Sequence, residues 1–177
     1  LAQTTEFYRS ILHTLLRVAA GFAAGMAAGL LAGTLTAFSR AADMLLTPLK
    51  NIIKATPVTS FIVLILLYFS SNVTPSAVAF LAVLPICWSN VCEGLRQTDK
   101  KMTELAHAYA FGRKKTLREI YFPAVRPYLS AAATTGLGFA WKSCVAAEVI
   151  ALSKNSVGRA LYESKLYLET AELFAWT

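Results

Sequence analysis

The sequence predicts an all-α fold, a polytopic membrane helical bundle, on three observations. The chain has 177 residues, of which 56% are hydrophobic and only 15% are charged, and its mean hydropathy is +0.52. A soluble domain usually carries about 25% charged residues. Long uncharged stretches account for the deficit, and residues 18–38 form the first of them. As a helix this stretch extends about 30 Å, the thickness of one hydrocarbon core.

Four apolar segments are predicted to cross the membrane within a single transmembrane domain, residues 1–177. They cover about residues 12–38, 57–70, 76–93 and 125–152. Pro85 interrupts the third segment, and Lys142 and Glu148 interrupt the fourth. Proline and charge inside a span are tolerated where they face protein or a water-filled cavity. These imperfect spans favour a protein that lines a pathway over a simple anchor.

The distribution of cations predicts the orientation in the membrane. Residues 39–57 and 93–127 together hold eleven of the 17 lysines and arginines, whereas residues 70–76 hold none. Because cytoplasmic loops are enriched in Lys and Arg, we expect residues 39–57 and 93–127 to be cytoplasmic and residues 70–76 to lie outside. The net charge of +7 is thereby explained by topology, and we expect the lipid bilayer and no nucleic acid as a partner.

Four glycines form a regular ridge in the first span. Gly21, Gly25, Gly29 and Gly33 recur every four residues, with alanines between them. Such a spacing places all four on one face of a helix, where another helix can approach closely. We therefore predict a helix-packing face, with a partner either in this chain or in a second subunit.

The segment Glu104–Pro123, "ELAHAYAFGRKKTLREIYFP", is the most charged part of the chain. Its pattern predicts two short helices with a bend, where Gly112 stops the first helix and "RKKTLREIYF" begins the second. Pro123 and Pro127 are expected to mark the entry into the fourth span. The segment, part of a loop at about residues 94–123, should project from the inner face of the bundle.

This segment resembles the signature loop of permeases of ATP-binding-cassette importers. The family pattern is Glu-Ala-Ala, three residues, Gly, nine residues, Ile, one residue, Leu-Pro. This chain matches every spacing, at Glu104, Leu105, Ala106, Ala110, Ile120, Phe122 and Pro123. Three of these residues differ from the pattern: Leu105 replaces Ala, Ala110 replaces Gly and Phe122 replaces Leu. Ala110 stands where the family has glycine. Gly112 follows two places later, so we expect the bend to be shifted toward it.

The resemblance extends to the nitrate/sulfonate/taurine-type branch over nearly the whole chain, through "CEGLRQTD", "FAWKSCVAAEVIA" and "SVGRALYESKLYLETAELFAWT". It implies a methionine-importer-like fold of six spans in a bacterial inner membrane, from which this chain lacks the first and the last. We expect a fragment or processed chain, because it starts at Leu1 and ends at Thr177 just after an apolar stretch opens.

What the resemblance implies about function is a permease without a catalytic site, cofactor or metal. Its loop would form a coupling helix that docks onto a separate ATPase subunit, present in two copies. An extracytoplasmic solute-binding protein would deliver the substrate to a permease homodimer. In this branch the substrates are nitrate, taurine, alkanesulfonates or heterocyclic vitamin precursors. Glu104 would be the charged contact, and Ala106 and Ala110 the close-packed face. The predicted coupling residues are Glu104, Leu105, Ala106, His107, Tyr109, Ala110, Phe111 and Gly112.

Two charges in the last span are candidate pathway or gate residues. Lys142 and Glu148 are six residues apart, about 240° around a helix, so they are not expected to pair with each other. The functional role expected for Lys142 is a place near the path of an anionic substrate, and that for Glu148 is a gate or a subunit contact. The structural alternative for either residue is snorkelling or a fixed ion pair between helices. Trp141 and Asn90 are weaker pathway candidates, and a hydrogen bond between helices is the plainer role for Asn90.

Two other classes of protein were weighed against a permease. An intramembrane hydrolase requires a nucleophile and base at membrane depth, but the sequence has no His-Glu-x-x-His or Gly-x-Gly-Asp motif. A membrane scaffold without transport is opposed by the imperfect spans and the signature loop. No Gly-x-x-x-x-Gly-Lys-Ser/Thr motif is present, so we expect ATP to be bound by a partner chain.

Overall fold

The computed structural model describes residues 5–177, apart from the side chains of Lys100 and His107. Every regular element in this range is helical. Nine α-helices and one π-helical turn, η1, follow one another: α1 Thr5–Phe38, α2 Arg40–Ala55, α3 Val58–Tyr68, α4 Thr74–Arg96, α5 Lys100–Ala108, α6 Arg113–Thr116, η1 Leu117–Tyr121, α7 Phe122–Ala151, α8 Val157–Leu166 and α9 Thr170–Trp176. The all-α prediction is therefore confirmed for the described residues.

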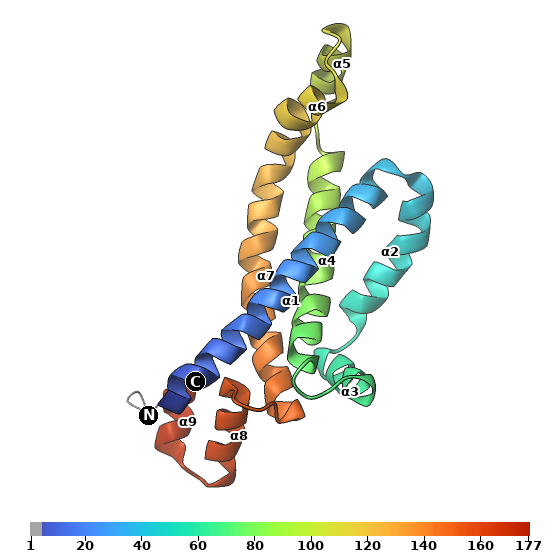
Figure 1. Ribbon diagram of the computed structural model, residues 1–177. Helices are drawn as coiled ribbons and strands as arrows, with labels where there is room; N and C mark the ends of the chain where they lie inside the picture. Colours follow the sequence, from blue (N-terminus) through green and yellow to red (C-terminus); the bar gives the residue numbers. More distant parts are fainter. Residues whose placement is uncertain (1–4) are drawn as a thin grey trace.

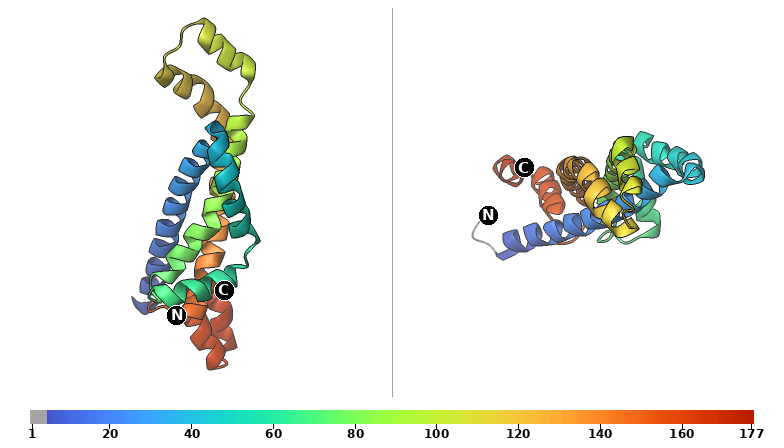
Figure 2. Two further views of the ribbon diagram at one scale, coloured as in Figure 1. Left: turned by 90° about the vertical axis from the view of Figure 1, so that its right-hand side faces the viewer. Right: turned by 90° about the horizontal axis from the view of Figure 1, so that it is seen from above.

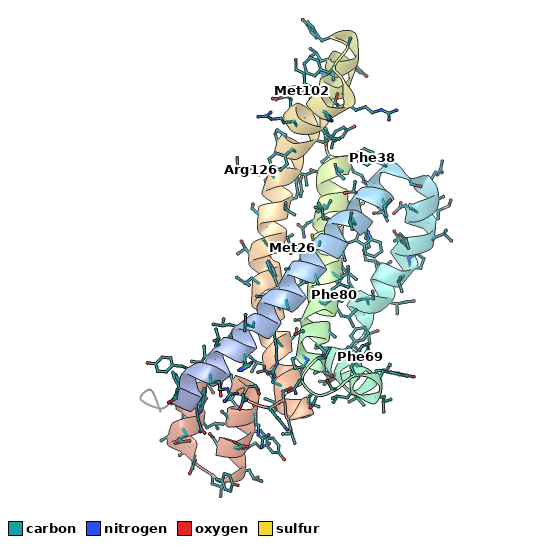
Figure 3. The ribbon with its side chains drawn as sticks, in the orientation of Figure 1. Met26, Phe38, Phe69, Phe80, Met102 and Arg126 are labelled. Carbon is teal, nitrogen blue, oxygen red and sulfur yellow. The ribbon has the colours of Figure 1, made fainter. Side chains whose placement is uncertain are left out.

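Three long helices, α1, α4 and α7, form the centre of an elongated bundle (Figure 1). The loop that carries α5 and α6 projects from one end, which we name the loop end (Figure 2). Helices α8 and α9 lie at the opposite end, named the far end, and α2 and α3 flank α4 on one side. The ring of Phe38, at the loop end of α1, packs edge-on against Tyr121 at 5.3 Å between centroids (Figure 3).

The glycine ridge of α1 packs directly on α4. All four glycines are buried, and a Cβ added to any of them would lie only 2.5–2.8 Å from the nearest atom of α4. The facing α4 side chains also recur every four residues and follow the glycines in the same order along the chain, so the two helices are parallel. These side chains are Ala79, Val83, Cys87 and Val91. The partner of the predicted packing face is thus in the same chain.

Helix α7 runs antiparallel to α4 and completes the core. Near the loop end, Ala132 packs with Cys87 and Val91. Towards the far end, Ala140 and Cys144 pack with Val18 and Ala79 of the other two helices. Small side chains on all three helices allow this close contact, which is the main source of association between helices where lipid surrounds them.

The predicted spans agree only partly with the helices. Helices α1 and α4 are long and apolar enough to cross a membrane, and α2 with α3 qualifies if the pair, bent by 103°, is one span. The expected span 57–70 is only the 11-residue α3, and residues 39–57, expected as a loop, mostly form α2. Thr56 is extended because the ring of Pro57 disfavours helical geometry before it, so α2 ends there.

Helix α7 begins at Phe122, directly before Pro123, where we expected the entry into the fourth span. Helices α6 and α7 are nevertheless continuous through η1. Pro123 has no N–H to donate to the carbonyl of Glu119, so the normal hydrogen-bond ladder is interrupted at this point. The chain instead widens into one π-helical turn, in which the Phe122 N–H bonds to the Leu117 carbonyl. A single helical rod therefore reaches from Arg113 to Ala151.

Substituting Gly29 with alanine is expected to destabilise the bundle. The new Cβ would meet the Cys87 Cβ at 2.6 Å and the Leu84 carbonyl oxygen at 2.9 Å. Overpacking of this kind costs about 1–3 kcal/mol. Thermal unfolding in detergent should therefore show a lower Tm for Gly29→Ala. Gly138→Ala is the matched control, because nothing lies within 4 Å of an added Cβ. Equal Tm values for the two variants would contradict the packing role.

Candidate functional site

The projecting loop presents an apolar stripe on α5. Met102, Leu105 and Tyr109 are 55%, 50% and 71% exposed. Their spacing of three and four residues places them on one side of the helix. Met102 lies beyond the end of the bundle, away from the other long helices (Figure 3). Three large apolar side chains at the tip of a loop are typical of a surface that another protein covers.

The bend between α5 and α6 lies at Ala110. This residue has a φ of +49°, and the N–H of Phe111 donates to the Ala106 carbonyl at 2.8 Å. This is the left-handed helix end at which glycine is preferred, because a Cβ is strained in that conformation. Gly112 has an ordinary φ of −67°. The expected shift of the bend to Gly112 is therefore wrong. The bend lies at Ala110, the residue that aligns with the glycine of the signature pattern.

The other predicted coupling residues differ in exposure. Glu104, Leu105, Tyr109, Ala110 and Gly112 are exposed, and Phe111 is half-buried. The Lys115 ammonium lies 3.9 Å from the centroid of the Phe111 ring. Ala106 is only 3% exposed, so its methyl group packs within this chain and is not available as an outward contact. The side chain of His107 lies outside the described residues.

Glu148 is fully buried in a polar network near the far end. Its carboxylate forms an ion pair with Arg17 of α1 at 2.9 Å. The Thr14 hydroxyl lies 2.9 and 3.0 Å from the two carboxylate oxygens, and the Gly158 N–H at the start of α8 donates at 3.2 Å. The Thr14 oxygen accepts from the Val157 N–H. Of the two roles left open for Glu148, the geometry is that of the fixed ion pair.

Arg17 was not among the predicted site residues. Its guanidinium also donates to the Asn72 side chain at 3.2 Å and to the Lys154 carbonyl at 3.1 Å. It therefore joins α1 to α7 and to the turns before α4 and α8. Arg17 directly precedes the apolar run that begins at Val18. A cation at that position indicates the end of a membrane span, and nothing near it in the sequence indicates a pair with Glu148.

Lys142 and Trp141 lie on the exposed side of α7. Lys142 has no ion pair or hydrogen bond among the described residues, and it does not contact Glu148, as its position in the sequence predicts. Asn90 donates to the Ile86 carbonyl of its own helix at 2.9 Å. The expected bond from Asn90 to another helix is therefore wrong, and the structure does not bring Asn90 together with Lys142.

A second polar network joins α1, α2 and α4 at the loop end. The Trp88 indole N–H donates to the Thr36 hydroxyl at 2.9 Å. Arg96 forms an ion pair with Asp43 at 2.6 Å, and the Lys50 ammonium lies 5.6 Å from the Trp88 ring centroid. The polar side of α2 thus faces the bundle, while Met44, Leu45 and Ile52 are exposed. This arrangement suits a helix with lipid on its outer side.

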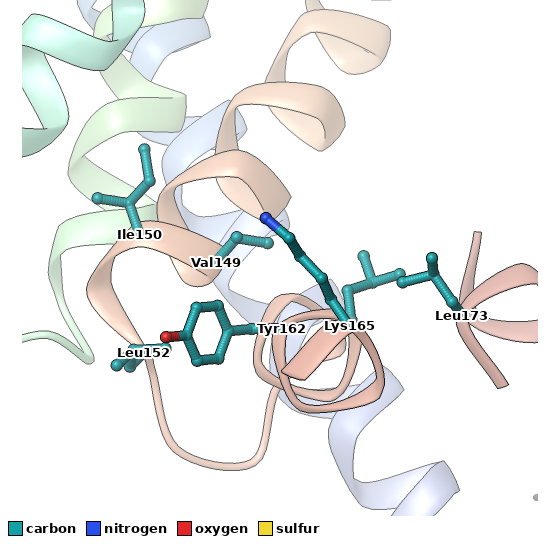
Figure 4. A pocket seen from close by; sticks show the side chains of 7 residues that line it. Val149, Ile150, Leu152, Tyr162, Lys165 and Leu173 are labelled. Carbon is teal, nitrogen blue, oxygen red and sulfur yellow. The ribbon is translucent and has the colours of Figure 1, made fainter. Parts of the chain in front are cut away.

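A pocket of about 420 Å³ lies where the far end of α7 meets α8 and α9 (Figure 4). Its wall is mostly aliphatic, with Tyr162 and Lys165 as the polar members: Val149, Ile150, Leu152, Leu161, Tyr162, Lys165 and Leu173. None of the residues predicted for coupling or for the pathway lines it. The pocket therefore contains none of the predicted site residues.

Comparisons with known proteins identify the family to which the chain belongs. Residues 25–176 match the family of binding-protein-dependent transport system inner membrane components. The match covers most of the chain and includes the projecting loop, the π-helical turn and α7. The chain therefore belongs to this family, whose members are components of the inner membrane.

Relatives of the chain include transport permeases from several bacteria. A "Putative aliphatic sulfonates transport permease protein" of Bacillus subtilis (strain 168) is 26% identical over 96% of this chain and 62% of the relative. A protein of the same description from Escherichia coli (strain K12) is 27% identical over 96% of this chain and 65% of the relative. A "Probable ABC transporter permease protein" of Brucella melitensis biotype 1 is 26% identical over 93% of this chain and 67% of the relative. The chain thus spans about two thirds of their length or slightly less.

Glu148→Gln is expected to destabilise the bundle, because it leaves the Arg17 cation without its buried counter-charge. Removal of one partner of a buried ion pair costs about 3–5 kcal/mol. The double variant Arg17→Gln/Glu148→Gln should recover part of the loss, as measured by unfolding in detergent. Arg159→Gln is the control, since its pair with Glu163 is about half exposed and such pairs contribute about 0–1 kcal/mol. Equal effects of Glu148→Gln and Arg159→Gln would contradict the assignment.

Ala110→Gly is expected to stabilise the bend by about 1 kcal/mol, because it removes the Cβ strain of a left-handed residue. Hydrogen exchange should slow at the amide of Phe111, whose N–H closes the turn. Gly112→Ala should leave the bend unchanged, since an added Cβ has nothing within 4 Å. The opposite pattern, with Gly112→Ala disruptive and Ala110→Gly neutral, would return the bend to Gly112.

Proposed function

We propose that this chain forms the membrane-spanning permease part of an ATP-driven importer, in which it contributes to the translocation pathway and couples it to a separate ATPase. Its membership of the transport-component family supports the class of function. The projecting loop, with its exposed apolar stripe Met102, Leu105 and Tyr109, is the observation that carries the coupling role. The chain itself would hydrolyse no ATP.

In this proposal α1, the bent pair α2–α3, α4 and α7 provide four membrane passages. The loop end faces the cytoplasm, because residues 39–57 and 93–127 hold most of the lysines and arginines. Helix α7 runs antiparallel along α4 and so shares its depth, although its composition is more polar than that of the other long helices. The whole protein would have a permease fold of the methionine-importer type.

The ATPase, in two copies, would cover the apolar stripe of α5. Large apolar side chains with a fixed helical spacing fit a groove on a partner. Glu104 lies exposed on the same helix and would add the charged contact. Buried Ala106 would act within the loop, because replacing its methyl group with a larger side chain disturbs the packing of α5 itself. This differs from the outward role that the family resemblance implies.

The remaining partners belong to the far end and to the membrane. A solute-binding protein would deliver substrate there, and a second copy of the permease would complete the pathway. The names of the Bacillus and Escherichia relatives support an aliphatic sulfonate as substrate. Nitrate, taurine-like anions or vitamin precursors are the alternatives within the same proposal.

The double variant Leu105→Ala/Tyr109→Ala should lose the ATPase. It removes two exposed side chains from the middle of the stripe, so the amount of ATPase that co-purifies with the permease and the uptake of substrate should both fall at least tenfold. Folding is expected to be unaffected because the two side chains are 50% and 71% exposed. Tyr68→Ala is the matched control, an equally exposed tyrosine (78%) towards the far end. Retention of the ATPase by the double variant would refute the proposed coupling surface.

A further inference from the structure

Lys142 is a membrane-depth cation without a described counter-charge. The residues of α7 two positions on either side of it, Ala140 and Cys144, pack in the core with Val18 and Ala79. Ala147, five residues further along α7, packs with Ile62 of the apolar helix α3. Lys142 thus lies about 7.5 Å deeper in the bundle than α3 does. A charge at such a depth normally faces protein or water.

Snorkelling to the far end is opposed by the direction of the side chain. In a helix the Cα–Cβ bond tilts towards the N-terminus. The N-terminus of α7 lies at the loop end, so the Lys142 side chain starts away from the nearer membrane surface. The other surface lies beyond Phe122, about 30 Å along the same helix. Lys142 therefore needs a counter-charge or water at its own depth.

The exposed residues that share a face of α7 with Lys142 are small. Ala131, Thr135, Gly138 and Ala146 are all exposed and lie with Lys142 within about 80° of the helix circumference. Leu137 and Phe139, each 52% exposed, flank this face. Helix α7 also fails the apolarity that α1 and α4 meet. We name Ala131, Thr135, Gly138, Lys142 and Ala146 the Lys142 face.

A second copy of this chain offers no negative charge at this depth. All ten acidic residues lie within the described part of the chain. Five lie at or beyond the loop end, from Asp43 to Glu119, and four lie at the far end. The tenth is Glu148, which is fully buried against Arg17. A copy related by an axis along the membrane normal would place its acids at these same levels.

We propose that the Lys142 face lines the water-filled translocation pathway and that the Lys142 ammonium attracts the anionic group of the substrate there. This inference rests on the proposed permease function and adds the anion-selecting residue to it. A lysine ammonium has three donors and a compact charge, which suits a single oxyanion such as a sulfonate. The small neighbours Gly138 and Ala146 leave room for the anion beside it.

The test uses thiol labelling of Gly138→Cys in the complete transporter, held in lipid nanodiscs so that both membrane surfaces are accessible. Gly138 is one turn from Lys142, and an added Cβ meets nothing within 4 Å. The probes are the sulfonatoethyl and the trimethylammonioethyl methanethiosulfonates, one anionic and one cationic. The native cysteines, Cys87, Cys92 and Cys144, are buried and provide the unreactive background.

Both reagents should modify Gly138→Cys, with the anionic one favoured. Adding Lys142→Gln should lower the ratio of anionic to cationic rates about tenfold, which corresponds to about 1.4 kcal/mol of attraction. Lys142→Arg should preserve the ratio. Leu137→Cys is the matched control, exposed at a similar depth but turned 100° from Gly138, and it should react slowly with both reagents.

Two outcomes would overturn the inference. If Gly138→Cys is as unreactive as Leu137→Cys, the Lys142 face meets lipid or protein instead of water. If Lys142→Gln leaves the ratio of anionic to cationic labelling rates unchanged, the Lys142 ammonium is neutralised by another segment and attracts no anion. Retention of the ATPase is measured on the same labelled complex and tests only the α5 stripe, which is distant from Lys142. A complex that keeps the ATPase but shows either outcome would therefore contradict this inference and not the proposed coupling.

Discussion

The close contact between α1 and α4 is the constraint on which the other features depend. Four glycines and four facing residues of α4 bring the two backbones together along nearly four turns. No Cβ fits at any of the four glycine positions without a shift of backbone or side chain. Because the two helices are parallel and fixed in register, the positions of Arg17 and Thr36 relative to α4 are fixed as well. The polar networks at both ends can therefore form only in this one alignment.

The two networks hold the remaining helices against this pair. At the far end, Arg17 and Thr14 bind Glu148 of α7 and the first turn of α8. At the loop end, Thr36 meets Trp88, and Arg96 meets Asp43 of α2. Loss of one partner destabilises the bundle more in the Arg17–Glu148 pair than in the Arg96–Asp43 pair, because the Glu148 carboxylate has no access to water. The networks thus specify which helix packs where, while close apolar contact supplies the cohesion.

Periodic features were predictable from the sequence, whereas long-range partners were not. The glycine spacing predicted a packing face, and the run of charged residues predicted two helices with a bend. The identity of α4 as the partner and of Arg17 as the counter-charge of Glu148 depends on contacts more than 50 residues apart, which no local pattern encodes. The bend was misplaced for a different reason. Glycine is the usual left-handed residue, but the spacing of hydrogen bonds at the end of α5 put that conformation on Ala110.

Helix α7 combines both kinds of charge on one rod. Its inward side carries Glu148, which is neutralised inside the chain, and its outward side carries Lys142, which has no described partner. The same rod continues through η1 into α6, directly behind the bend at Ala110. A helical segment that contains η1 therefore lies between the bend at Ala110 and the Lys142 face. The regular hydrogen-bond ladder is relaxed at Leu117–Tyr121, with Pro123 beside it, and Pro127 inside α7 removes a further donor about one turn on. Bending would concentrate in this segment, between the α5 stripe and the Lys142 face.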